Sequence, residues 1–148
     1  MGLFNSFNIS ASALSAQRLR MDIIAQNIAN VNTTRTEEGT PYRRKTLVFQ
    51  EKESEVPFSH YLSESTRNQF SIGSGVRVTG IVEDPTPFKD VYDPSHPDAD
   101  ENGIVQMPNI EVVTEMVNMI SATRAYEASV TALNASKSMA TKALEIGR

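Results

Sequence analysis

The chain of 148 residues contains no cysteine and no tryptophan. Without cysteine there can be no disulfide framework and no metal site built on thiolate ligands. Long apolar runs are absent too, because no stretch approaches the roughly 18 residues that predict a membrane span. The first residues also lack a basic segment followed by an apolar one, so we expect no cleaved secretory signal. What remains is a chain the size of one ordinary domain.

Histidine is scarce, with only His60 and His96 in the chain. Neither residue lies in a pair with metal-ligand spacing, and neither accompanies a serine in a nucleophile elbow. The residues therefore suggest no catalytic site. We expect no cofactor and no small-molecule substrate.

Basic charge is also sparse. The formal net charge is −4, and the counted charges give +1 for residues 1–34, zero for residues 105–148 and −5 for residues 35–104. A nucleic-acid binder needs a basic face. The one basic cluster, YRRK at residues 42–45, is better explained as the polar start of a strand. The charge distribution therefore argues against a nucleic-acid partner.

Apolar residues recur every seven positions near the N-terminus, at Phe7, Leu14, Met21 and Ile28. This spacing is typical of the seam of a coiled coil or a bundle helix. It predicts a helix over residues 10–30, roughly 32 Å long, with Ser10 as its N-cap.

Three asparagines lie at the end of this predicted helix, at Asn27, Asn30 and Asn32. Asparagine is a mediocre helix former that tolerates the left-handed conformation in which helices end, so Asn30 and Asn32 predict a helix stop. Asn27 lies beside the apolar stripe, where its amide needs a partner. That partner could be the backbone of the same chain or another chain, and the alternative is that Asn27 faces solvent.

The C-terminal segment repeats the same spacing, at Val112, Met119, Tyr126, Leu133 and Ala140. It predicts a helix over residues 110–146, roughly 55 Å long. The start and stop signals are Pro108, Asn109 and Gly147. More than a third of so long a stripe would find no partner on the N-terminal helix. We expect the two helices to pair in antiparallel fashion within one chain.

The middle of the chain alternates apolar and polar residues in short stretches. Residues 46–53 and 75–84 are predicted strands, and residues 88–94 are a shorter third candidate. Residues 54–75 are loop-like and predicted to be mobile.

The predicted fold is mainly α, with a coiled-coil-like antiparallel pair of long terminal helices and a small β-containing middle. The expected division is an N-terminal helical segment over residues 1–34, a middle segment over residues 35–106 and the long helix over residues 107–148.

The stretch DADENG, residues 98–103, resembles the first half of a calcium loop. The twelfth position of such a loop needs a bidentate glutamate and is occupied here by Asn109. Pro94 and Pro97 also exclude an entering helix. We therefore expect a turn without a bound metal.

Two terminal stretches form a specific pair of motifs. The first reads SASALSAQRLRMDIIAQNIANVNTT, and the last reads NIEVVTEMVNMISATRAYEASVTALNASKSM. Together they resemble the terminal signatures of bacterial flagellar axial proteins. The middle stretch reads GVRVTGIVEDPTPFKDVYDPSHPDADENGIVQMPN and narrows the resemblance to the proximal rod group of the flagellar basal body. Ile104 departs from the family pattern, which has an aromatic residue after the glycine.

The resemblance implies a structural subunit that joins itself and other rod proteins in a helical tube and transmits motor torque. It also implies export across the inner membrane by the flagellar type III apparatus, without a cleaved signal, to the basal body. Asn27 would then be a specificity device in the assembled helix bundle. The implied assembly interface comprises Phe7, Leu14, Met21, Ile24, Asn27, Ile28, Val112, Met116, Met119, Tyr126, Val130 and Leu133.

The residues alone leave two other classes of function open. The apolar stripes would also suit a cytoplasmic helical adaptor or chaperone that binds a partner helix. A small enzyme is the weakest candidate, because convergent acid, base and nucleophile residues are missing. A rod subunit is expected to be partly ordered when isolated, whereas an adaptor should form a defined small complex.

Overall fold

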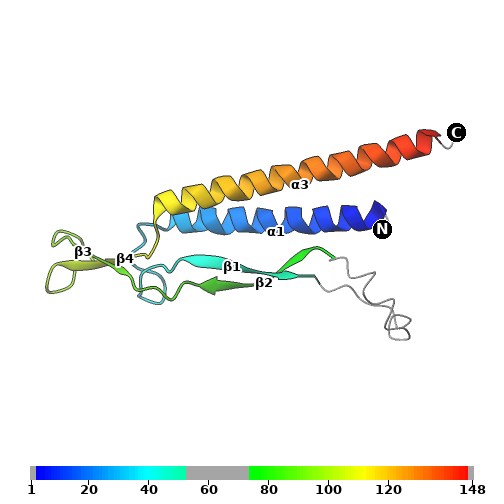
Figure 1. Cartoon of the computed structure of the whole chain (residues 1–148). Coiled ribbons are helices and arrows are strands. Elements are labelled where there is room, and N and C mark those ends of the chain that lie inside the picture. The colour runs from blue at the N-terminus through cyan, green and yellow to red at the C-terminus, as the bar shows by residue number, and fades with distance from the viewer. Residues whose placement is uncertain (1–2, 53–73, 147–148) are drawn as a thin grey trace, which may run out of the picture.

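Two long helices and two small sheets make up the computed structural model, which describes residues 3–52 and 74–146 (Figure 1). Helix α1 spans Leu3–Ala29 and helix α3 spans Val112–Ile146. The strands are β1 (Lys45–Glu51), β2 (Val76–Glu83), β3 (Lys89–Tyr92) and β4 (Ile104–Met107). The stretch predicted to be a mobile loop lies almost wholly outside the described residues.

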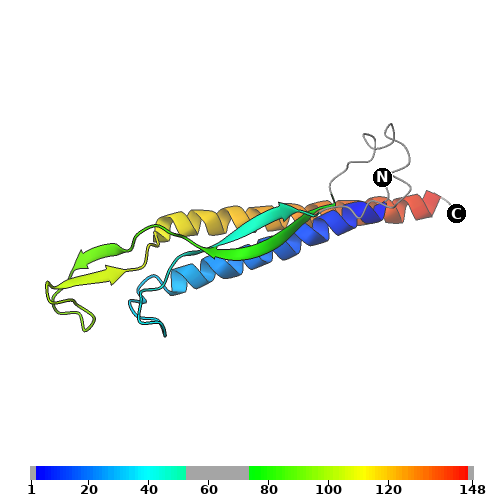
Figure 2. The same cartoon turned by 90° about the horizontal axis from the view of Figure 1, so that it is seen from below.

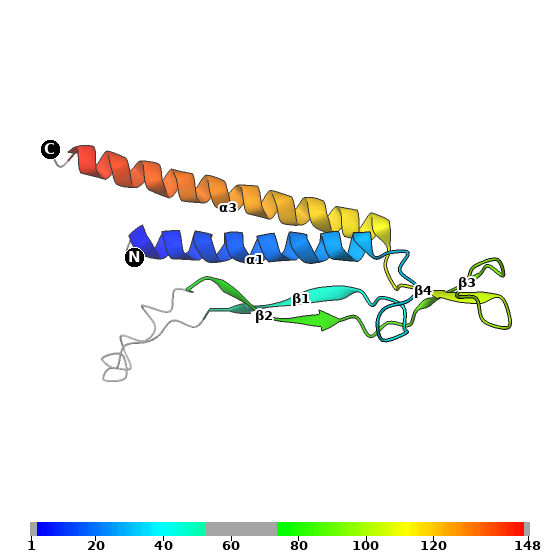
Figure 3. The same ribbon diagram turned by 180° about the vertical axis from the view of Figure 1, so that it is seen from behind.

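The two helices lie side by side and run antiparallel, as Figures 1 and 3 show. Near the end of α1, Asn27 Nδ2 donates to Glu115 Oε2 at 3.0 Å. Further along the pair, Thr123 Oγ1 donates to Met21 Sδ at 3.6 Å, so residue numbers rise on one helix as they fall on the other. The predicted fold class is therefore confirmed.

Helix α1 begins earlier than the periodicity predicted. It starts at Leu3, so Ser10 lies inside the helix. The prediction that Ser10 is the N-cap is therefore wrong. Phe7 and Ile9 lie in this added part and are half-buried. Their burial stabilises a part of the helix that the capping signals in the sequence did not indicate. With 27 residues in α1 and 35 in α3, the unpaired part of α3 is smaller than the predicted third.

The hairpin of β1 and β2 covers the side of α1 that faces away from α3 (Figure 1). Its antiparallel register shifts once, between Val48 and Phe49. Val76 N donates to Ser12 Oγ at 3.1 Å, and this bond ties the hairpin to the helix. Gly75 has a φ of +106°, and a Cβ there would collide with the Ser12 side chain. The molecule is thus layered as α3, α1 and hairpin.

The second hairpin, β3 with β4, projects beyond the end of the helices at which α1 stops (Figure 2). The predicted third strand is β3, whereas β4 was not predicted because a run of four residues, IVQM, is too short to reveal a period of two in the sequence. Its strand conformation depends on pairing, with Tyr92 opposite Ile104. The connecting turn closes where Gly103 N donates to Asp100 O at 2.8 Å.

Few side chains are buried for a chain of this length. The buried apolar residues among those described are Ala16, Ile23, Ile24, Pro41, Tyr42, Val105, Pro108, Ile110 and Ala122. Neither helix is long and apolar enough to cross a membrane, within the described residues. The small core leaves much of α3 without cover from its own chain.

Candidate functional site

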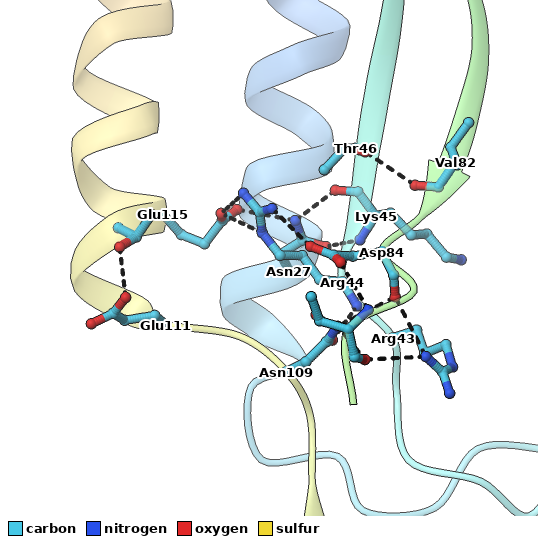
Figure 4. Close-up of polar contacts among 12 residues, drawn as sticks. Asn27, Arg43, Arg44, Lys45, Thr46, Val82, Asp84, Asn109, Glu111 and Glu115 are labelled. Carbon is cyan, nitrogen blue, oxygen red and sulfur yellow. Dashed lines mark hydrogen bonds and ion pairs between the residues drawn. The ribbon is translucent and has the colours of Figure 1, made fainter. Parts of the chain in front are cut away.

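Polar side chains converge where α1 ends, α3 begins and the β1–β2 hairpin opens (Figure 4). They come from four separate parts of the sequence, which the fold brings to one end of the helix pair. We name this group the polar junction, and its members are Asn27, Tyr42, Arg44, Asp84, Asn109 and Glu115.

Asn27 is only 1% exposed and uses its whole amide within the chain. Its Oδ1 accepts from Lys45 N at 2.9 Å and from Tyr42 Oη at 3.1 Å. Its Nδ2 donates to Lys45 O at 2.9 Å and to Glu115 Oε2 at 3.0 Å. Two donated and two accepted bonds exhaust what the side chain can do on its two hydrogens and two lone pairs. The alternative that Asn27 faces solvent is wrong.

Glu115 is a carboxylate only 1% exposed, on the face of α3 that meets α1. Its Oε1 accepts two bonds from Arg44, from Nη2 at 2.7 Å and from Nε at 2.9 Å. A buried charge is costly unless it is paired and hydrogen-bonded. Arg44 and Asn27 together supply the pairing that makes this burial tolerable.

Arg44 also connects the junction to the end of the hairpin, through Asp84 Oδ2 at 3.3 Å. Burial alone would lower the pKa of Arg44, but its hydrogen bonds and charge interactions with Glu115 and Asp84 together raise that pKa above its ordinary value. The pKa of Asp84 is lowered, first by the hydrogen bond from Thr86 N and to a lesser degree by Arg44. Both groups therefore stay charged through the neutral range.

Tyr42 is the aromatic member of the junction and donates to Asn27. Burial raises the pKa of its phenol, and the nearby charges of Glu83 and Glu115 raise it further. The phenol thus stays protonated at neutral pH and remains a donor.

Asn109 links the segment before α3 to two other parts of the chain. Its Oδ1 accepts from Arg44 N at 2.9 Å, and its Nδ2 donates to Thr86 Oγ1 at 2.7 Å. The residue was predicted as a helix start signal, and it lies three positions before α3 begins at Val112. Its side chain holds neighbouring loops in place instead of bonding to the first turn of α3.

The side chains of the polar junction make structural contacts. The polar junction contains no serine or histidine beside its carboxylates that would form a nucleophile with its base. Across the described ranges 3–52 and 74–146, no group of three or more histidines and carboxylates could hold a metal ion. What the arrangement can do is fix the ends of four segments relative to one another.

A second feature lies on the opposite side of α3. Val113, Met116, Val117 and Ile120 follow the spacing i, i+3, i+4, i+7 of one helix face, and each is more than half exposed. We name these four residues the outer stripe. On the same face the following residues are polar, as at Arg124 and Thr131. The outer stripe is an apolar helix face with no cover from the described parts of its own chain.

The residues predicted for an assembly interface fall into three groups in this structure. Ile24 and Asn27 are buried, and Val112 and Met116 are exposed. The half-buried remainder, which lies on the two helices, is Phe7, Leu14, Met21, Ile28, Met119, Tyr126, Val130 and Leu133. Most of the predicted seam is therefore partly covered within the chain.

Sequence reasoning missed two sets of residues. Val113, Val117 and Ile120 were overlooked because the heptad through Val112 and Met119 describes only one face of a helix that has two apolar faces. Arg44 and Glu115 were overlooked because their pairing spans 71 positions. A glutamate flanked by valines and methionines was the available signal for a buried charge.

Comparison with known proteins supports one family. Residues 7–35 match the family described as "Flagella basal body rod protein", and residues 101–146 match "Flagellar basal body rod FlgEFG protein C-terminal". The chain is 49% identical over 152 residues to the flagellar basal-body rod protein FlgC of Bacillus subtilis, with all of both chains covered.

Two further relatives agree. The FlgC protein of Borreliella burgdorferi is 48% identical over 155 residues, covering 99% of this chain and 98% of the relative. The FlgC protein of Salmonella typhimurium is 41% identical over 148 residues, again with all of both chains covered. Similarity of this extent over the full length leads to one conclusion: the chain belongs to the FlgC family of flagellar basal-body rod proteins.

Proposed function

We propose that the chain is a structural subunit of the rod of the bacterial flagellar basal body. It assembles through its helices with other rod proteins and with copies of itself, and the resulting helical tube transmits motor torque. The observation that carries this mode of assembly is the outer stripe, Val113, Met116, Val117 and Ile120, which stays exposed although both helices have formed and paired.

The size of the stripe supports an assembly role. Full burial of one such side chain is worth about 1.5–3 kcal/mol relative to exposure, so four together contribute several kcal/mol against the cost of association. Contiguous exposed apolar patches on soluble chains usually mark interaction sites. A rod in which every subunit buries this face gains that energy at each contact.

The half-buried seam supplies the rest of the proposed interface. Residues such as Met119, Tyr126 and Leu133 are only half-buried and retain accessible surface for a neighbouring helix. In this proposal the segments 1–34 and 107–148 carry the assembly contacts, and the segment 35–106 lies beside them. Asn27 acts inside the subunit, where it shapes the surface that neighbours meet.

The proposal includes export through the flagellar apparatus without a cleaved signal, and it assigns no catalytic activity. The small buried core and the lack of cysteine support passage of an unfolded chain. A cytoplasmic adaptor or chaperone is not favoured, because relatives that match the chain over its whole length are named rod proteins.

The test is complementation of a bacterium whose own gene for this protein is deleted. Val117→Asp places a charge in the middle of the outer stripe, and we expect export to continue while rod completion and swimming fail. Thr131→Asp is the matched control on the same face of α3, where the helix is already polar. Normal swimming of the Val117 variant would remove the stripe from the assembly interface, and swimming of the deletion strain itself would contradict the structural role.

A further inference from the structure

The negative charge of the buried Glu115 carboxylate is neutralised by a residue that belongs to neither helix. The two helices contribute Asn27 and Glu115, whose bond is 3.0 Å long. That bond satisfies one carboxylate oxygen and leaves the negative charge without a counterion. The counterion is Arg44, which lies in the segment just before β1 and bonds to Glu115 Oε1 at 2.7 and 2.9 Å.

The helices themselves offer no substitute for Arg44 at this end. On α1 the nearest base is Arg20, seven positions before Asn27 and about 10 Å away along the axis. On α3 it is Arg124, nine positions after Glu115 and about 13 Å away. Lys45 Nζ lies over the ring of Tyr42, 5.5 Å from its centroid. Closing the helices without Arg44 would therefore bury an uncompensated carboxylate, which is strongly unfavourable.

Asn27 holds the segment that carries Arg44 against α1 through bonds that do not involve α3. Its Oδ1 and Nδ2 bond to both the N–H and the C=O of Lys45, as a partner strand would. This docks the segment before β1 onto α1 and needs no residue of α3. The docked segment then presents the Arg44 guanidinium and the second Asn27 hydrogen as a site for one carboxylate.

We propose that Arg44 gates the closure of the helix pair, so that α3 packs against the end of α1 only after the segment carrying Arg44 has docked. Glu115 keeps the pair open until then, because its charge stays in water. The device rests on the proposed function in one respect, since it makes the closed pair the form that enters a rod. In this way α3 presents its surface for assembly only when the hairpin is correctly placed.

The test separates a gate from ordinary packing by removing the arginine and then the charge that requires it. In the deletion strain, Arg44→Met leaves Glu115 unpaired, and we expect swimming to fall at least tenfold. Adding Glu115→Met to that variant removes the buried charge, and we expect at least half of wild-type swimming to return. Arg77→Met is the matched control, because Arg77 is an exposed arginine on β2 that bonds only to Gln50 among the described residues.

A second measurement follows closure directly in the full-length chain. Met21→Cys with Thr123→Cys places a thiol pair where α1 and α3 touch, in a chain with no other cysteine. The yield of the intrachain disulfide should fall at least fivefold with Arg44→Met and return with the added Glu115→Met. Arg44→Lys keeps the charge and should retain most of the yield.

Two results would overturn the gate while leaving the rod function intact. One is an Arg44→Met chain that swims and crosslinks like the wild type. The other is a double variant no better than Arg44→Met alone, which would mean that Arg44 acts through hairpin packing and not through the charge of Glu115. A deletion strain that swims would instead contradict the proposed function.

Discussion

Helices α1 and α3 carry the same heptad spacing but have different surroundings. Helix α1 lies between α3 and the β1–β2 hairpin, and with 27 residues it buries Ala16, Ile23, Ile24 and Asn27. Helix α3 has 35 residues and is covered on one side, so that it buries only Glu115, Ala122 and Ser136. A seven-residue period therefore indicates that a helix has an apolar face, and it does not indicate whether the same chain covers that face.

The contrast also locates where each helix acts. The buried residues of α1 make their contacts inside the subunit, so substitutions at these residues should lower the stability of the isolated chain. The exposed face of α3 is completed by neighbours, and substitutions there should spare the chain and affect the rod.

The largest effect is expected at the end of α1. Asn27→Leu leaves the N–H of Lys45 and one oxygen of Glu115 without partners in a buried site, at a cost of about 3 kcal/mol. Urea unfolding of the full-length chain, followed by circular dichroism, measures it. Asn32→Ala is the control, because Asn32 is an exposed asparagine in the turn that follows α1. Equal stability of the two variants would show that the polar junction does not hold α1 in place.

The second effect concerns the hairpin side of α1. Gly75→Ala puts a Cβ against Ser12 at a φ of +106°, and we expect a loss of about 2 kcal/mol. Gly80→Ala, in the strand β2 that begins just after Gly75, is the matched control, since its Cβ meets nothing within 4 Å. Thermal unfolding should separate the two. If Gly75→Ala unfolds at the wild-type temperature, the hairpin is not docked on α1 as described.

The third prediction compares two alanines of α3. Ala122 is 0% exposed, so Ala122→Leu overpacks the contact with α1 and should cost about 1–3 kcal/mol. Ala128 is exposed on the same helix, and Ala128→Leu should leave unfolding of the isolated chain nearly unchanged. The midpoint of urea unfolding reports both. A larger loss at Ala128 would reverse the assignment of covered and open faces.

The smallest effect depends on pH at the polar junction. The pKa of Tyr42 is raised above its ordinary value of 10.0, chiefly by burial and then by Glu83 and Glu115. Its contribution to stability is therefore present below pH 10 and is lost as the pH rises through the folded value. Tyr42→Phe should cost about 1 kcal/mol at neutral pH and should weaken the fall in stability above pH 10. An unchanged alkaline slope in the variant would mean that the phenol is not held neutral by the fold.

The two helices could be predicted from the sequence, because apolar residues repeated every seven positions are strong evidence for a helix and for its approximate length. The start of α1 was missed because Phe7 and Ile9 acquire their helical conformation from burial, not from a cap. Strand β4 was missed for a related reason, since its conformation is set by pairing with β3. Isolated short segments carry little information about partners that lie elsewhere in the chain.

Two long helices with apolar faces, a β-containing middle and, through the terminal motifs, the family could all be predicted from the residues alone. The sequence also marked Asn27 as a residue that needs a partner. The folded chain was needed to show that these partners are Tyr42, Lys45 and Glu115, and that Arg44 neutralises the buried carboxylate. The physical reason is that periodicity is a local property of the chain, whereas the cost of burying an amide or a charge is set by whichever distant segment folding brings beside it.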